Sequence, residues 1–507
     1  MLGVGTASRG GLHSYEQGAH MRSVSDSAGA SRAFLVALAS ISLFSLLCVS
    51  GCAVGPSYRK PTPVLERFHS AAALRTRPTS APAPTLETWW DGFNDPVLSR
   101  IVLQARDQNL DLAAALARVQ QARAAAREAG AQLLPTFDLN GQATRIHQSL
   151  ESPIGQIASH VPGFNRDQAI YDAGLGASWE LDLFGGLRRG REAASAEADA
   201  ATAEQVGTRI SVTADAADAY LRIRGDQARI AVAEQQVATD ERLLELVRQR
   251  FGRGLAAVRE VAQAEALMSQ ARASLQPLRI DLEAQLNRLD VLLAVQPGTS
   301  VLQLQTPVDI PSVPNVSASD EPLQVLRRRP DVIAAERHLA ASNARIGRAI
   351  AGYYPKISLA GLLGYESTSP ADLFKAATFQ PQAVAGLRWR VFDFGKVSAE
   401  VAQAKGANAG AIARYKQAVL RAAEDVENAF TSLVQLEAHN QELLTEVAAL
   451  TRARDASQDA YQGGVIALTD VLDADRQLLT AQDELAQTRA DAARAAVGAF
   501  RALGGGW

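Results

Sequence analysis

One long motif occurs twice in this chain of 507 residues, and that internal repeat restricts the fold more than any other feature. Residues 109–141 align with residues 329–361 at an offset of 220, and after a variable stretch the offset becomes 210. The smaller offset relates these residues: Gly176 to Gly386, Trp179 to Trp389, Phe184 to Phe394 and Gly254 to Gly464. A repeat of this length predicts two copies of one large module rather than a short-period solenoid.

The repeat divides the chain into five parts. We expect a signal peptide at residues 1–51, an N-terminal segment at 52–107, a first repeat at 108–295, a linker at 296–327 and a second repeat with a C-terminal tail at 328–507. The linker is rich in proline over residues 296–314, as connections between modules often are. Each repeat is expected to contain a helix, two strands and a pair of long helices.

Apolar and polar residues alternate in two segments of each copy, at residues 135–144 and 171–183 and at residues 357–366 and 387–391. In the last of these, Leu387, Trp389 and Val391 oppose Arg388 and Arg390. A period of two with one apolar face predicts half-buried strands. A soluble sandwich is the alternative, but the strand lengths, the terminal aromatic residues and the charges on the other face favour a membrane barrel.

Four strands are too few to close a barrel, since about eight are the minimum. An open strand edge is not tolerated within lipid, because its backbone groups have no hydrogen-bond partner there. Spanning strands therefore require more than one copy of the chain. Two copies supply eight strands and three supply twelve, and the strand count alone does not decide between them.

Long helices are predicted for much of the remainder, at residues 188–250, 258–295, 397–460 and 468–503. At 1.5 Å per residue the first of them extends roughly 90–100 Å. Apolar residues recur three, four or seven positions apart, which is typical of coiled-coil packing and also of an ordinary bundle core. The predicted fold class is therefore α+β, with four strands and long helices in two structural repeats.

The two cysteines of the chain lie at the end of an apolar run, residues 33–49. Arg22 and Arg32 precede this run and small residues follow it, which is the pattern of a secretory signal; translation from Met21 is our hypothesis. Cys48 reads as a small buried hydrophobe, and two cysteines exclude a disulfide framework. The net charge of −3 gives no basic field for nucleic acid.

Residues 49–52, Val-Ser-Gly-Cys, resemble the bacterial lipobox, in which cleavage leaves the cysteine as an acylated N-terminus. The resemblance implies N-palmitoyl and S-diacylglycerol groups on Cys52. Ala53, rather than aspartate, follows the cysteine, and this implies sorting to the outer membrane. Several acyl chains, at about 0.8 kcal/mol per buried CH₂, anchor a chain essentially permanently.

Four longer motifs carry a resemblance to one family. They are RRPDVIAAERHLAASNARIGRAIAGYYPKISLAG at residues 328–361, WWDGFNDPVLSRIV at 89–102, CAVGPSYRKP at 52–61 and YQGGVIALTDVLDADRQLLTAQDEL at 461–485. They resemble the outer-membrane efflux lipoproteins, which are the TolC-like factors of tripartite pumps. The closest likeness is to the lipidated branch that works with resistance–nodulation–division (RND) transporters, and it covers nearly all of residues 52–503.

The resemblance implies a homotrimer in the bacterial outer membrane. A twelve-stranded β-barrel would continue into a twelve-helix α-barrel that extends roughly 100 Å into the periplasm, with an equatorial belt formed by the N-terminal segment, the linker and the C-terminus. The implied function is a passive multidrug efflux duct, supplied by an inner-membrane RND transporter through a periplasmic adaptor (membrane fusion) protein. Neither an enzymatic activity nor a cofactor is implied, apart from the covalent lipid.

Glycines predict where the long helices turn back. RFGRGLAAV at residues 250–258 and YQGGVIALTD at 461–470 occupy equivalent places in the two copies, and glycine permits the backbone conformation of a tight turn. The resemblance implies that these tips also contact the adaptor. The residues that match the family pattern are Gly254 with Leu255 and Gly464 with Val465.

Beyond the second tip, Asp470, Asp473 and Arg476 are spaced by three, so they share one helix face. Such a run is usually a solvated charged face, although rings of carboxylates in an assembly can attract cations at a constriction. The resemblance implies that Asp470 and Asp473 form an acidic periplasmic gate, with Tyr461 and Arg476 as its latch partners. The matching residues of the first repeat fit less well and leave its part in the gate open: Glu260, Gln263 and Glu265.

Other functions find less support in the sequence. The seven histidines show no metal-ligand spacing, His338 reads as helix packing, and GGLRRG at residues 185–190 reads only as a strand-to-helix joint. Nucleophile-elbow, P-loop and zinc motifs are absent from the sequence. Two alternatives stay open: an exit channel for type I protein secretion, and a structural coiled-coil lipoprotein of the envelope without a conduit.

Overall fold

The computed structural model describes residues 53–62, 66–75, 77, 82–300, 304–317 and 322–506. The chain separates into two units, Met1–Cys52 and Ala53–Trp507, and all that follows concerns the second. The predicted signal peptide and Cys52 lie outside the described residues. No helix in the described ranges is both long and apolar enough to cross a membrane.

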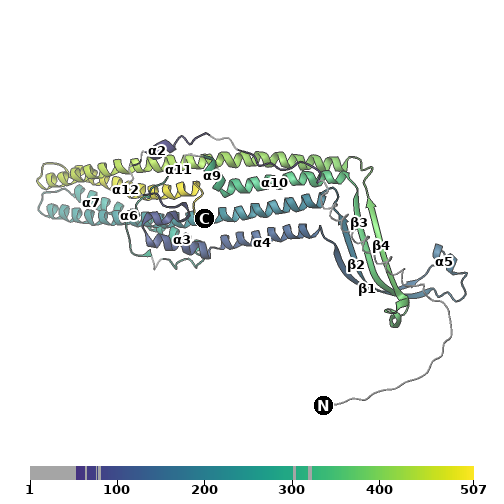
Figure 1. Cartoon of the computed structure of the whole chain (residues 1–507). Coiled ribbons are helices and arrows are strands. Elements are labelled where there is room, and N and C mark those ends of the chain that lie inside the picture. The colour runs from purple at the N-terminus through teal and green to yellow at the C-terminus, as the bar shows by residue number, and fades with distance from the viewer. Residues whose placement is uncertain are drawn as a thin grey trace, which may run out of the picture. The chain divides into compact units, whose positions relative to one another are not determined.

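A four-stranded antiparallel sheet joins the two repeats (Figure 1). It consists of β1 (Thr136–His147), β2 (Asp167–Leu181), β3 (Lys356–Ser367) and β4 (Phe379–Arg388), paired in the order β1-β2-β3-β4. The first repeat supplies β1 and β2, the second supplies β3 and β4, and the central pairing of β2 with β3 connects the copies. Each outer strand is left with one unpaired edge in the single chain.

The last strand corrects the prediction. Alternation predicts a strand through Val391, whereas β4 ends at Arg388. Arg388 pairs with Lys356, which is the first residue of β3, so among the described residues no strand residue lies opposite Trp389 or Val391. The apolar face is also not half-buried in the single chain, since the side chain of Leu139 is 84% exposed.

The four long helices agree with the prediction to within a few residues, and each has the same length as its counterpart in the other repeat. The first repeat contains α4 (Leu110–Ala131), α6 (Gly186–Gly252) and α7 (Val258–Leu292); the second contains α10 (Pro330–Ile350), α11 (Lys396–Gln462) and α12 (Leu468–Ala502). Both α6 and α11 have 67 residues, and both α7 and α12 have 35. α6 packs against α4, α7, α10 and α12 (Figure 1).

The main hydrophobic core lies where the N-terminal segment, the linker and the C-terminus meet the long helices. The 3₁₀ helix η1 (Leu86–Phe93) buries Trp89, whose ring stacks on Phe500 of α12 at 5.4 Å. Leu304 of the linker is 3% exposed in the same core. Shorter elements complete the chain: α2 (Ala71–Arg75), α3 (Pro96–Gln108), α5 (Pro153–Ala158), α9 (Pro322–Arg328), η2 (Ala351–Tyr353), η3 (Pro370–Asp372) and η4 (Ala376–Thr378).

An N-terminal strap, residues 53–61, crosses from the first repeat to the second. The amide of Val54 donates to the carbonyl of Phe184 at 3.1 Å, and the side-chain amide of Asn343 on α10 donates to the carbonyl of Pro56 at 3.1 Å. Tyr58 donates its hydroxyl proton to the buried carboxylate of Glu336. The strap therefore connects the segment between β2 and α6 to α10.

Candidate functional site

The two helix hairpins turn with the same geometry. Gly254, between α6 and α7, has φ +73°, and Gly464, between α11 and α12, has φ +74°. At the next residue, the amide of Leu255 donates to Arg250 and that of Val465 to Ala460, each at 2.9 Å. Positive φ explains why glycine is needed here, because a side chain would be strained in this conformation.

Both turns present an apolar side chain to solvent. Leu255 is 65% exposed and Val465 is 79% exposed, although apolar residues nearby are buried. The buried set forms a cluster that holds the four helices together next to the turns: Leu243, Leu244, Val247, Ala264, Tyr461, Leu468 and Val471. The predicted tip residues therefore lie on a firmly packed support and remain available for a partner.

Tyr461 links the two tips. Its hydroxyl donates to Oε2 of Glu260, the third residue of α7, at 3.2 Å. The guanidinium of Arg250 lies over its ring, 4.6 Å from the centroid, and donates from Nη1 to the carbonyl of Tyr461 at 3.2 Å. Burial raises the pKa of the Tyr461 phenol, and the charge of Glu260 raises it further. We call Arg250, Glu260 and Tyr461 the tip latch.

The predicted gate residues do not all come together within one chain. Nη2 of Arg476 lies 2.7 Å from Oδ1 of Asp473, and both side chains are more than half exposed. Asp470 instead accepts the amide of Ala467 at 3.2 Å, which stabilises the first turn of α12. The phenol of Tyr461 hydrogen-bonds across to Glu260 in the first repeat rather than to these carboxylates.

Three residues of the first repeat match the family's gate pattern less well than those of the second, and the structure gives them separate roles. Glu260 belongs to the tip latch, and Glu265 accepts a hydrogen bond from Nη2 of Arg248 at 2.8 Å. Oε1 of Gln263 is buried and has no hydrogen-bond partner among the described residues. Of the three, only Glu260 therefore contacts a predicted gate residue of its own chain.

A pair of buried carboxyl groups lies farther along the same hairpins. Asp240 of α6 is 1% exposed and Asp475 of α12 is 2% exposed. Gln236 donates to Oδ1 of Asp240 at 2.7 Å, and Arg454 of α11 lies 3.6 Å from Oδ1 of Asp475. Neither Oδ2 of Asp240 nor Oδ1 of Asp475 has a hydrogen-bond partner in the described part of the chain.

Burial raises the pKa of Asp240 to about 6, against the lowering effect of Gln236, and the charge of Asp475 adds to the rise. Burial likewise raises the pKa of Asp475, although Arg454 opposes the shift. Sequence reasoning missed both groups. A signal was present, because Asp475 follows Leu468 and Val471 at the spacing of an apolar helix stripe.

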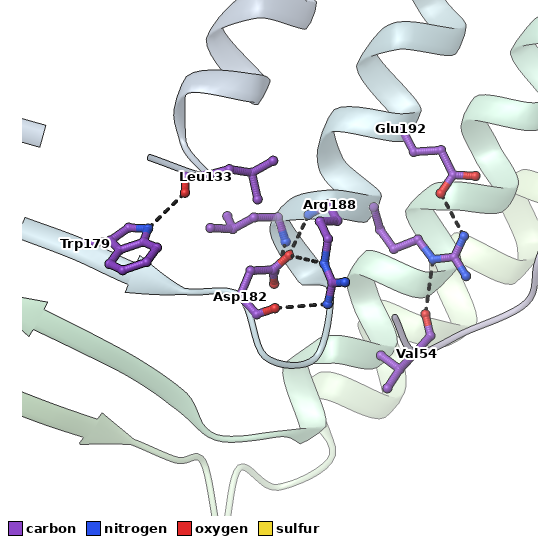
Figure 2. Close-up of polar contacts among 8 residues, drawn as sticks. Val54, Leu133, Trp179, Asp182, Arg188 and Glu192 are labelled. Atoms are coloured by element: carbon purple, nitrogen blue, oxygen red, sulfur yellow. Dashed lines mark hydrogen bonds and ion pairs between the residues drawn. The ribbon is translucent and has the colours of Figure 1, made fainter. Parts of the chain in front are cut away.

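The joint between β2 and α6 does more than connect two elements, contrary to the reading of residues 185–190 as a joint only. Figure 2 shows Asp182, whose Oδ2 accepts the amide of Arg188 at 2.7 Å, so that it caps the helix. The side chain of Arg189 donates to the carbonyl of Val54 in the strap at 3.3 Å. Gly185 has φ +79°, and a Cβ there would come within 2.7 Å of Ala53.

His338 also has a more specific role than helix packing. From α10 its two ring nitrogens contact Glu197 at 2.8 Å and Glu204 at 3.0 Å, both on α6. The hydrogen bond with Glu197 is the main cause that raises the pKa of His338 to about 9. The contact is an ion pair between two helices. In the described ranges no three His, Cys, Asp or Glu residues are placed to hold a metal ion.

The geometry defines a class of protein. A sheet with one exposed apolar face runs directly into helices of 67 residues, and paired hairpins end in a latched turn. An outer-membrane channel that continues as a helical conduit has this construction.

The comparisons name the family. The family described as outer membrane efflux protein matches residues 101–295 and 322–505, and the chain belongs to it. The pyoverdine export outer membrane protein OpmQ of Pseudomonas putida is 32% identical over 453 residues, which are 88% of this chain and 94% of that protein. Nodulation protein T of Rhizobium leguminosarum bv. trifolii is 30% identical, over 88% of this chain and 92% of the relative.

Solved structures with the same fold also belong to outer-membrane channels. The outer-membrane channel OprN superposes with a TM-score of 0.82 at 32% identity, over 90% of this chain and all of that one. The open state of the MtrE outer membrane channel of Neisseria gonorrhoeae gives a TM-score of 0.76 at 28% identity, over 90% of this chain and 98% of that one. The protein is an outer-membrane efflux channel, as the motifs predict.

Proposed function

We propose that three copies of this chain form the exit duct of a tripartite efflux pump. Each copy supplies four strands, so three complete a twelve-stranded barrel, and its long helices extend the barrel as a conduit through the periplasm. The equal lengths of the helices in the two repeats support this arrangement, because a closed wall needs equivalent units all around. Solutes pass through passively, and an inner-membrane RND transporter provides the energy.

The arrangement of the two helix turns supports the proposal most directly. The tip latch ties the first hairpin to the second, and the exposed Leu255 and Val465 lie on the turns beside it. A periplasmic adaptor protein with a complementary apolar surface would bind these two side chains. Its binding would then act on the latch, and on the acidic gate of Asp470 and Asp473, at short range.

A lipid on Cys52 is part of the same proposal. Ala53 packs against Gly185, where the strand ends and the helix begins, and the strap hydrogen-bonds to Phe184 beside it. Ala53 is the first residue that the structure describes, and its packing at this joint would hold the start of the mature chain against the fold.

Related proteins are named for pyoverdine export and for toluene and solvent efflux. From this we infer that the present channel exports small organic compounds. The test is conductance of the purified protein in planar bilayers, together with accumulation of a fluorescent dye in cells that lack the channel. Discrete conductance steps and restored dye efflux are expected. Absence of conductance in the bilayer would favour the structural lipoprotein. Secretion of a protein without dye efflux would favour the exit channel of type I secretion.

A further inference from the structure

The sheet has a polar face opposite its apolar one, and the charges on the polar face are unevenly distributed. Alternate residues of each strand lie on this face, and the register aligns them across the strands. The charged side chains that the four strands place there are Asp138, Asp172, Glu180, Lys356, Glu366 and Arg388. In the proposed barrel the apolar face contacts lipid, so the polar face lines the duct.

Basic groups lie at the end of this face that adjoins the long helices (Figure 1). Lys356 begins β3 and Arg388 ends β4, and the register sets them directly opposite each other, although opposed like charges destabilise a sheet. Nζ of Lys356 lies 2.9 Å from Oε1 of Glu180. Arg388 makes no ion pair or side-chain hydrogen bond with any residue in the described ranges. Its charge is therefore available to ions in the duct.

A cavity of about 400 Å³ adjoins this end of the sheet, and Glu180 and Lys356 lie on its wall together with Arg348 of α10. Each charged side chain of the lining except Arg348 has an ion-pair partner. Arg348 has none in the part of the chain that the structure describes. The unpaired charges of the cavity and the adjoining strand ends are therefore both positive, on Arg348 and Arg388.

Acidic groups occupy the far end of the same face. Asp172 of β2 lies directly opposite Glu366 of β3, which is again an unfavourable pairing of like charges. Neither carboxylate forms an ion pair or a side-chain hydrogen bond with another residue that the structure describes. A third acidic residue of the face, Asp138, lies between the two ends. The described strands therefore place their basic side chains on this face only at the helix end.

The two ends are far enough apart to act separately. Lys356 and Glu366 are ten positions apart in β3, and a strand rises about 3.3 Å per residue, so roughly 30–35 Å separates them. The Debye length at 0.1 M salt is about 10 Å, much shorter than this distance. Each end therefore keeps the sign of its own charges.

We propose that this face gives the duct two zones of opposite charge in series. Arg348 and Arg388 concentrate anions next to the helices, and Asp172 and Glu366 concentrate cations at the outer end. The inference rests on the barrel of the proposed function and assigns residues that determine its ion selectivity. Rings of charged side chains set the selectivity of pores in this way, and every copy in the assembly adds to both zones.

Two such zones should make the current depend on the sign of the voltage. When the outside is positive, anions from the inner zone and cations from the outer zone both move towards the middle of the barrel, so charge carriers accumulate there. The opposite voltage draws both kinds of ion out of the middle and depletes it. The conductance should therefore be higher when the outside is positive.

Single-channel currents of the purified, intact channel test the proposal. In about 0.1 M KCl we expect about twice the current when the outside is positive, because the local potentials then enrich counter-ions. In about 1 M KCl the Debye length falls to about 3 Å, and the two currents should become equal. Orientation is assigned with Ser159→Cys in a background with Cys52→Ala. Biotin on this exposed loop between β1 and β2 binds streptavidin only from the outer chamber.

Two double variants separate the zones. Arg348→Gln with Arg388→Gln, and Asp172→Asn with Glu366→Gln, should each bring the ratio of the two currents close to one. In a salt gradient the reversal potential should shift towards cation selectivity in the first variant and towards anion selectivity in the second. Asp167→Asn is the matched control and should change neither property, because it removes a carboxylate from the outer end of β2 on the opposite face.

Equal currents at the two voltages in the unmodified channel at low salt, or a larger current when the outside is negative, would overturn the proposal. An asymmetry that persists in both double variants would also overturn it, because the tip gate is unchanged in them and would then be the cause. Shifts of the reversal potential in the same direction would do so too. Absence of any conductance would instead contradict the duct of the proposed function, so the two failures are distinguishable.

Discussion

The hydroxyl of Tyr461 lies 3.2 Å from Oε2 of Glu260, and this hydrogen bond spans 201 residues of sequence to join the ends of two helix hairpins. Because the contact is partly buried, its loss is expected to cost about 0.5–1.5 kcal/mol. Tyr461→Phe keeps the ring beneath Arg250 and removes only this bond. We predict a higher single-channel conductance for this variant. Tyr415→Phe removes a hydroxyl at the strap instead and serves as control; equal conductance of both variants and the unmodified channel would exclude a latch.

The Asp473–Arg476 pair is predicted to restrict the channel from its exposed face. Within one chain an exposed ion pair contributes at most about 1 kcal/mol, so its influence depends on repetition around the assembly. Asp473→Ala and Arg476→Ala should each raise conductance, and Asp473→Ala should also weaken selection for cations. Arg279→Ala breaks another exposed pair, with Glu234 at 3.3 Å, and should change neither. Unchanged conductance in both variants would show that Asp473 and Arg476 do not form the gate.

The buried Asp240 predicts a pH dependence of the tips. Its pKa in the folded chain is about 6 against an ordinary value of 3.8, so the folded state binds the proton more tightly. The stabilisation is fully present below 3.8 and is lost as the pH rises through about 6. Amide exchange in residues 240–252 and 468–475, corrected for its intrinsic rate, should therefore be about tenfold faster at pH 7.5 than at pH 5.

Asp240→Asn should remove most of that difference, because the amide cannot ionise. Asp459→Asn changes an exposed carboxyl group of α11 by the same chemistry and should leave the pH dependence intact. If Asp240→Asn keeps the full difference between pH 5 and pH 7.5, another group is responsible for it.

Neighbouring glycines at the second tip allow a test of the turn. Gly464 has φ +74°, whereas Gly463 has φ −71°. Alanine at Gly464 would meet no atom within 4 Å, so its penalty is conformational, roughly 1–2 kcal/mol. Gly464→Ala should accelerate amide exchange at residues 461–468, and Gly463→Ala should not. Equal behaviour of the two variants would show that the turn tolerates a side chain.

The lipid on Cys52 should be a second anchor rather than the only one. Because the sheet would already hold the protein in the membrane, Cys52→Ala behind a cleavable signal peptide should still give an outer-membrane oligomer. Fractionation of the envelope measures this. The same signal peptide on the unmodified chain is the control, and complete loss of the variant from the outer membrane would mean that the strands do not span it.

Local patterns were sufficient to predict the helices. α12 was predicted at 468–503 and extends from Leu468 to Ala502, because glycines before it and the glycine-rich end after it break the helix. The fourth strand was misplaced for a physical reason: alternation specifies which face a residue occupies, and pairing requires a neighbour. Trp389 and Val391 alternate correctly, and no strand residue pairs with them in the described part of the chain.

The candidate site was harder to predict, because its contacts are made between distant helices. The positions of glycines in the sequence were enough to predict the turns at Gly254 and Gly464, where φ is positive. The partnership of Tyr461 with Glu260 and Arg250 depends on how one hairpin lies against the other, which no periodicity in a single segment records. The charge of Asp475 acts on Asp240 of another helix for the same reason, and only the place of Asp475 in an apolar stripe indicated its burial.

The two open edges of the sheet have a consequence for biogenesis. In the proposed barrel the strands span the membrane, and unpaired backbone groups in lipid cost several kcal/mol each, so a lone chain would not cross the membrane and wait for the others. Insertion and assembly must then be a single event, and its rate should rise more steeply than the first power of the chain concentration. Scarce expression would leave chains stranded in the periplasm, where their exposed apolar face would make them substrates for proteases.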